Sequence, residues 1–153
     1  MAQPIRALLA LVHVLGAIWW FGGMMFAYFC LRPAAAESLD PPERLTLWTA
    51  AFDRFLRYTS IAVVLLVFSG FTLLVETGWR NAPTGWLVMT GLGLLMTLVY
   101  GQVYLVLFPR LRDQSRLSAW PAAAIELNKI RRFVGINLLL AAGAVVAAVM
   151  ARH

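Results

Sequence analysis

The sequence contains few charged residues for its length. Asp, Glu, Lys and Arg make up 13% of its 153 residues, whereas 61% are hydrophobic. A soluble domain usually has about a quarter of its residues charged, and a chain of this size cannot hide so many apolar side chains from water. The scarcity of charge therefore excludes an ordinary soluble enzyme and a disordered chain, and it predicts a membrane protein.

Groups that carry familiar chemistry are also scarce. Cys30 is the single cysteine, which excludes a disulfide within the chain. We interpret it as a small apolar filler, with a soft metal ligand as the alternative. The apolar runs contain no hydrolytic triad, no phosphate-binding glycine loop and no paired carboxylates. We therefore expect no catalysis by acid–base or nucleophilic routes, and the sequence favours a non-enzymatic function.

Four long stretches lack charge completely. They hold 25, 18, 29 and 19 residues and occupy positions 7–31, 58–75, 81–109 and 133–151. A transmembrane helix needs ~20 apolar residues at ~1.5 Å each to cross the ~30 Å hydrocarbon core of a bilayer. The pattern predicts one all-α domain, a membrane-spanning four-helix bundle with helices over about residues 5–31, 57–75, 86–108 and 131–150.

Prolines suggest where these helices end and where shorter ones begin. Pro33 is expected to end the first helix and Pro109 the third, because proline lacks the N–H that a helix interior needs. Short amphipathic helical stretches are expected on the cytoplasmic side. One begins at residue 41, lies along the inner membrane surface and turns into the second span near Arg57. The other begins at Pro121 and leads into the fourth span.

Lys and Arg are distributed unequally between the two sides of this bundle. One side holds three of them, Arg6, Arg80 and Arg152. The other holds ten: Arg32, Arg44, Arg54, Arg57, Arg110, Arg112, Arg116, Lys129, Arg131 and Arg132. Because positive residues in short loops stay cytoplasmic, both termini are predicted to lie outside, on the periplasmic side of a bacterial inner membrane. This rule also explains the net charge of +6 without a nucleic-acid partner.

His13 is the only histidine within a predicted span. It lies seven residues after Arg6, about 10 Å below the outer interface, and an ionisable group at that depth is a functional candidate. Met89 falls at a similar depth and Met24 lies deeper along the same helix as His13, so these three residues form the predicted metal site. The alternative is a neutral imidazole that is hydrogen-bonded to a hydroxyl of the second span, Ser69 or Thr72.

Other polar and small residues have predicted roles in packing and in lipid contact. The amides of Gln102 and Asn137 are expected to hydrogen-bond across the third and fourth helices. Four arginines are expected to bind anionic lipid headgroups: Arg54, Arg57, Arg131 and Arg132. Small residues that repeat every four positions predict close helix packing or a homodimer seam: Gly93, Thr97 and Gly101, and Gly143, Ala147 and Ala151.

Several short motifs carry a resemblance to a known family. His13, Trp20-Phe21-Gly22-Gly23 and Leu31-Arg32-Pro33 resemble the first helix of the CopD-like (copper resistance protein D domain) membrane proteins. Further matches are Arg54-Phe55, Ser69-Gly70, Ile130-Arg131-Arg132 and Asn137. The resemblance spans nearly the whole chain. It implies a four-helix bundle in the bacterial inner membrane that takes up or handles copper, with a periplasmic copper donor as a partner.

The resemblance leaves three functions open. Copper handling comes first, with the ion held through His13 and Met side chains, because Cu(I) favours imidazole and soft sulfur ligands and weak sites at successive depths suit permeation. In close relatives a histidine is expected where this chain has Gln102, so an inner metal site would be altered here. The alternative is a b-type haem protein similar to the HemJ type of protoporphyrinogen oxidase, with His13 as an axial ligand. A non-catalytic accessory subunit is the third.

Overall fold

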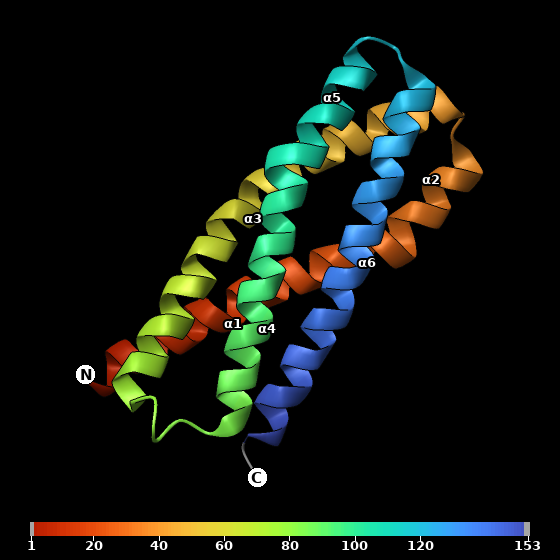
Figure 1. The fold of residues 1–153 in the computed structure, drawn as a ribbon. Helices are drawn as coiled ribbons and strands as arrows, with labels where there is room; N and C mark the ends of the chain where they lie inside the picture. The colour runs from red at the N-terminus through yellow and green to blue at the C-terminus, as the bar shows by residue number, and fades with distance from the viewer. Residues whose placement is uncertain (1, 152–153) are drawn as a thin grey trace.

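The computed structural model describes residues 2–151, so the predicted positions of Arg152 and His153 lie outside the described residues. The described chain folds into four helical rods (Figure 1). Their segments are α1 (Gln3–Phe26), η1 (Ala27–Leu31) and α2 (Arg32–Ser38); α3 (Pro41–Thr77); α4 (Thr84–Gln102), η2 (Val103–Leu107) and α5 (Phe108–Arg116); and α6 (Trp120–Met150). All four rods are long and apolar enough to cross a membrane. The prediction of an all-α, four-span membrane protein is confirmed.

The two prolines that were expected to end helices do not end them. The rods continue beyond Pro33 to Ser38 and beyond Pro109 to Arg116, and each proline lies two residues after a π-helical turn, η1 or η2. In an α-helix, proline removes one hydrogen bond and its ring clashes with the carbonyl four residues earlier. A π turn is wider and uses bonds to the fifth residue back, such as the bond from the Arg32 N–H to the Ala27 oxygen. The wider turn gives each proline ring room.

The second helix is also longer than expected. The stretch that was expected to be separate and the second span form one helix, because α3 runs without interruption for 37 residues. It begins with two prolines in its first turn, where their missing N–H groups are harmless, and it ends at Gly78, whose φ of +82° favours glycine. Its buried residues continue at helical spacing through the expected turn: Leu45, Trp48, Phe52, Leu56, Thr59 and Val63. The buried stripe is continuous across position 57, so the two expected segments belong to one helix.

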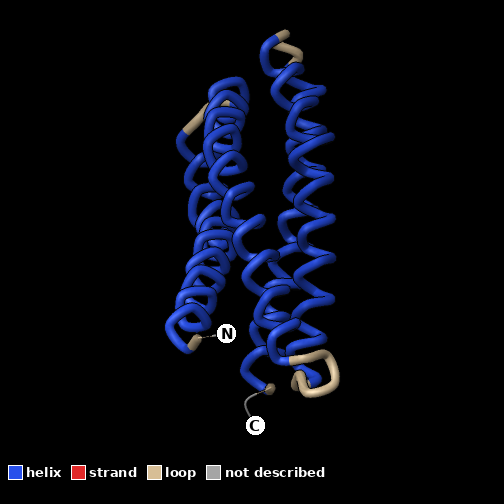
Figure 2. Tube along the Cα trace, turned by 90° about the vertical axis from the view of Figure 1, so that its left-hand side faces the viewer, coloured by secondary structure: helices blue, strands red, loops and turns tan. Residues whose placement is uncertain are grey.

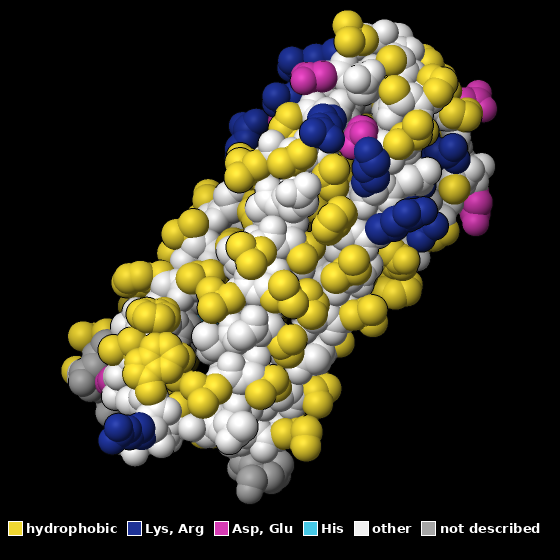
Figure 3. All heavy atoms as spheres, viewed as in Figure 1, with side chains coloured by type: hydrophobic (Ala, Val, Ile, Leu, Met, Phe, Trp, Pro, Cys, Tyr) yellow, Lys and Arg dark blue, Asp and Glu magenta, His cyan; other side chains and the backbone are white. Residues whose placement is uncertain are grey.

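The rods pack mainly as two pairs, α1 with α3 and α4 with α6, while α5 contacts both α6 and α3. Connecting loops lie only at the two ends of the bundle (Figure 2). Both ends of the described chain lie at one end, which we call the terminal end (Figure 1). Most Lys and Arg side chains gather at the other end, around α2, α5 and the starts of α3 and α6, which we call the basic end (Figure 3).

Much of the buried core lies at the basic end. Large side chains from α3, α5 and α6 are buried there, including Leu45, Trp48, Phe108, Leu111, Leu127 and Ile130. At the terminal end residues 3–8 of α1 are all exposed. The α4–α6 pair closes through small residues, because Gly85 lies directly against Ala147 and Ala151. The small face of α6 is therefore used within the chain.

Candidate metal site

The imidazole of His13 is fixed by the neighbouring helix α3. Its Nδ1 atom lies 3.0 Å from the Leu66 carbonyl oxygen and 3.2 Å from the Ser69 hydroxyl. Since a carbonyl oxygen can only accept a hydrogen bond, Nδ1 must carry the hydrogen and donate it. In the neutral ring the lone pair then belongs to Nε2, for which the described residues provide no hydrogen-bond partner.

Ser69 helps to hold the His13 ring in this orientation. Its side chain is fully buried, and its hydroxyl donates to the carbonyl oxygens of Leu65 at 2.6 Å and Leu66 at 3.2 Å. With its own hydrogen engaged, the Ser69 oxygen is left to accept from His13. The residue therefore helps to fix the ring and its tautomer, as the partners behind metal-binding histidines usually do. The predicted alternative partner, Thr72, instead donates to the Phe68 carbonyl oxygen.

Gly70 provides the space for the histidine ring. A methyl group at this position would lie 2.7 Å from His13 Cε1 and 3.1 Å from Nδ1, too close for any side chain. Gly16, nearly one turn further along α1, allows a similar approach, because its own Cβ would lie 3.3 Å from the Ala62 carbonyl oxygen. The Ser69-Gly70 pair thus combines a hydrogen-bond acceptor with the clearance that the ring requires.

The three predicted metal ligands lie on different parts of the fold. Met24 follows His13 by eleven residues on one helix, about 16 Å away at ~1.5 Å per residue, and is buried in the core. Met89 lies half-buried on α4, which packs chiefly against α6, while its contact with α1 is slight. Residues 2–151 contain no cluster of three or more His, Cys, Asp or Glu side chains. His13 therefore shares its immediate surroundings with Ser69 and Gly70.

The two amides have different positions. The Asn137 side chain donates from Nδ2 to the Met96 carbonyl oxygen at 3.4 Å, which links α6 to α4 as expected. Gln102 is exposed and makes no cross-helix hydrogen bond within the described chain. The expectation for Gln102 was wrong because the rotation of α4 turns this residue outward, a property that its depth in the span does not determine.

The four arginines that were expected to bind lipid do not form one group. Arg54 and Arg57 are exposed on α3, where Arg54 donates to the Ala50 carbonyl oxygen and Arg57 pairs with Asp53 at 2.9 Å. Arg132 is exposed on α6. Arg131 differs from these three, because it is half-buried and its guanidinium lies 5.8 Å from the Trp48 ring.

Sequence reasoning missed a polar contact in the middle of the bundle. The Tyr100 hydroxyl donates to the Leu56 carbonyl oxygen at 2.8 Å and lies 2.7 Å from the Ser60 hydroxyl. This contact joins α4 to α3. No local sequence pattern predicts this contact, because it depends on how the two helices are rotated toward one another.

Four rods that are long and apolar enough to cross a membrane indicate a multi-pass membrane protein. His13, anchored by α3, is the one histidine among residues 2–151. Residues 49–151 match the family model described as CopD, copper resistance protein D. The chain belongs to this family of copper-resistance membrane proteins, as its short motifs predicted. His13 lies before the matched residues. No curated protein and no solved structure matches the chain.

Proposed function

We propose that this protein handles copper in the bacterial inner membrane and that it receives Cu(I) on Nε2 of His13. The observation that carries the proposal is the anchored ring: Nδ1 donates to the Leu66 oxygen, so the free lone pair lies on Nε2. A neutral imidazole with one nitrogen fixed behind it is a good ligand for copper. Membership in the copper resistance protein D family supports the choice of metal.

A single imidazole fits an ion in transit. His13 offers one metal ligand. Of the other proposed ligands, Met89 lies on α4 and Met24 lies deeper along α1. Soft thioethers at separate depths would hold Cu(I) weakly in succession, which is the condition for release as well as entry. We therefore propose copper as cargo, delivered by a periplasmic donor and moved inward. The haem b alternative gains no support from the family match.

The test measures Cu(I) affinity of the purified protein in detergent against a coloured Cu(I) chelator. His13→Ala and His13→Leu should both abolish the tightest binding, and the leucine variant fills the volume of the ring, which separates ligation from cavity formation. His153→Ala removes the other histidine and should bind like the parent. If both His13 variants bind copper as tightly as the parent, the histidine is a structural residue and the proposal fails. The same conclusion holds if both variants unfold. A strong Soret band in the purified parent would show that the protein binds haem b, and the haem alternative would then replace the copper proposal.

We also propose that both termini face the periplasm. Support comes from the ten-to-three distribution of Lys and Arg between the two sides and from the position of both ends of the described chain at one end of the bundle (Figure 1). A reporter that is active only after export should work when it is fused behind His153. A reporter that is active there only in the cytoplasm would reverse the proposed direction.

A further inference from the structure

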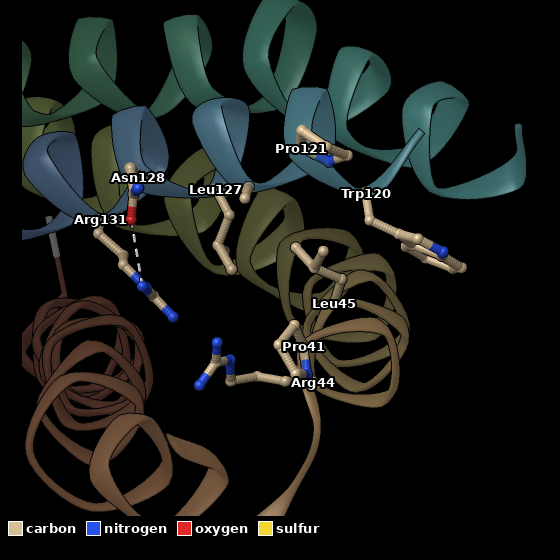
Figure 4. A pocket seen from close by; sticks show the side chains of 9 residues that line it. Pro41, Arg44, Leu45, Trp120, Pro121, Leu127, Asn128 and Arg131 are labelled. Carbon is tan, nitrogen blue, oxygen red and sulfur yellow. Dashed lines mark hydrogen bonds between the residues drawn. The ribbon is translucent and has the colours of Figure 1, made fainter. Parts of the chain in front are cut away.

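A pocket of about 320 Å³ opens at the basic end, between the starts of α3 and α6 (Figure 4). Its walls are apolar on one side, where Leu45, Leu127 and Trp120 lie, and cationic on the other, where Arg44 and Arg131 lie. The volume falls within the ~300–1,000 Å³ range of small-molecule sites. Nothing in the copper proposal uses this pocket, which lies at the end of the bundle opposite the Gln3 end of α1.

The charged wall brings together arginines from different rods. Arg44 of α3 and Arg131 of α6 extend toward one another (Figure 4), and both Arg32 and Arg44 lie close enough to act electrostatically on Arg131. Within residues 2–151 none of the three makes an ion pair with a carboxylate, although Asp40 and Glu43 are near Arg44 in the sequence. The pocket therefore concentrates positive charge that the described chain leaves uncompensated.

The hydrogen-bonding capacity of Arg131 is also largely unused. One of its nitrogens, Nη1, donates to the Asn128 side chain at 3.2 Å, while its Nε is buried without a partner. A buried donor without an acceptor is costly, and like charges held together at reduced dielectric repel each other. A bound anion would offset this repulsion, and each arginine presents a planar set of donors that matches the oxygens of an anion.

We propose that this pocket binds a phosphate group between Arg44 and Arg131. A guanidinium group can bind two phosphate oxygens at once. Because the rods are long enough to span a bilayer, we expect their basic end to lie at the level of the lipid phosphates. An anionic phospholipid and a free phosphate ion share this chemistry. The apolar wall of Leu45, Leu127 and Trp120 matches the glycerol and upper acyl portion of a lipid.

The experiment uses native mass spectrometry and titration of the full chain in detergent with phosphatidylglycerol or inorganic phosphate as probes. The double variant Arg44→Gln/Arg131→Gln should weaken retention of one phosphatidylglycerol by about 30-fold. The control Arg110→Gln/Arg116→Gln removes two exposed charges from α5 at the same end and should change retention less than about threefold. If the two double variants lose lipid retention equally, the retention depends on general surface charge, and the proposal is overturned.

Two further arms identify the source of the phosphate and protect the test against misfolding. If inorganic phosphate does not displace the lipid, the ligand is a headgroup; if phosphate binds the parent and not the pocket variant, the ligand is the free ion. Arg44→Lys/Arg131→Lys keeps the charge but loses the paired donors, so it should fold and bind several-fold more weakly than the parent. Parental binding of both probes by this lysine variant, or binding of neither probe by the parent, would overturn the proposal.

Discussion

The two ends of the bundle are built differently. At the basic end, α3, α5 and α6 meet around large buried side chains such as Trp48, Leu111 and Ile130. Toward the terminal end the rods pack as pairs through small residues, and the α1–α3 pair holds His13 against Gly70. Close packing of large apolar groups provides stability, whereas a contact through small residues leaves space for a polar side chain between the helices. We therefore expect the basic end to contribute most to stability, whereas the proposed copper ligand lies toward the terminal end.

The strongest way to break this comparison is to damage the core of the basic end. Ile130 is completely buried on α6, and Ile130→Ala should lower the free energy of unfolding by about 2–5 kcal/mol. Ile136 lies on the same helix and is 48% exposed, so Ile136→Ala should change it by no more than about 0.5 kcal/mol. Reversible denaturation in mixed micelles measures both. Similar losses in the two variants would show that the basic end is no better packed than the lipid-facing surface.

A substitution at Gly70 sharpens the comparison, because it should affect chemistry more than stability. Gly70→Ala places a methyl group 2.7 Å from the His13 ring and forces that ring away from Leu66. The copper affinity on which the proposed function depends should fall about 10–100-fold, as it does when the groups behind a metal ligand are disturbed. Gly93→Ala is the matched control, because its methyl group meets no atom within 4 Å. An unchanged Cu(I) affinity in Gly70→Ala would show that copper binding does not depend on the position of the His13 ring.

The smallest effect is expected on the exposed rim of the basic end. Arg57 pairs with Asp53 one turn earlier, and the Arg57 side chain is 71% exposed. Arg57→Gln should change the free energy of unfolding by no more than about 0.5 kcal/mol, and high salt should remove the difference. The measurement is the same denaturation at low and at high ionic strength. A loss comparable to that of Ile130→Ala would assign the stability of this end to charge.

The sequence predicted the spans well because length, hydropathy and absence of charge are local properties. Ser69 was also foreseen as a partner of His13, because depth along two neighbouring spans can be counted from their ends. The neighbours of Met89 on α4 could not be predicted, since they depend on which rods form pairs. The same holds for Arg44 and Arg131, which meet from α3 and α6 although 86 residues separate them in the sequence.

The π turns before Pro33 and Pro109 also set the rotational phase of the two rods that contain them. An α-helix advances about 100° per residue, and a π turn introduces one extra residue. The segment after η2 is therefore rotated by about 100° relative to an uninterrupted helix of the same sequence. This rotation sets the direction in which α5 presents Leu111, which is completely buried. Loss of one residue from Val103–Leu107 would leave the hydropathy of the span almost unchanged, yet it would turn the basic end of this rod out of alignment with its neighbours.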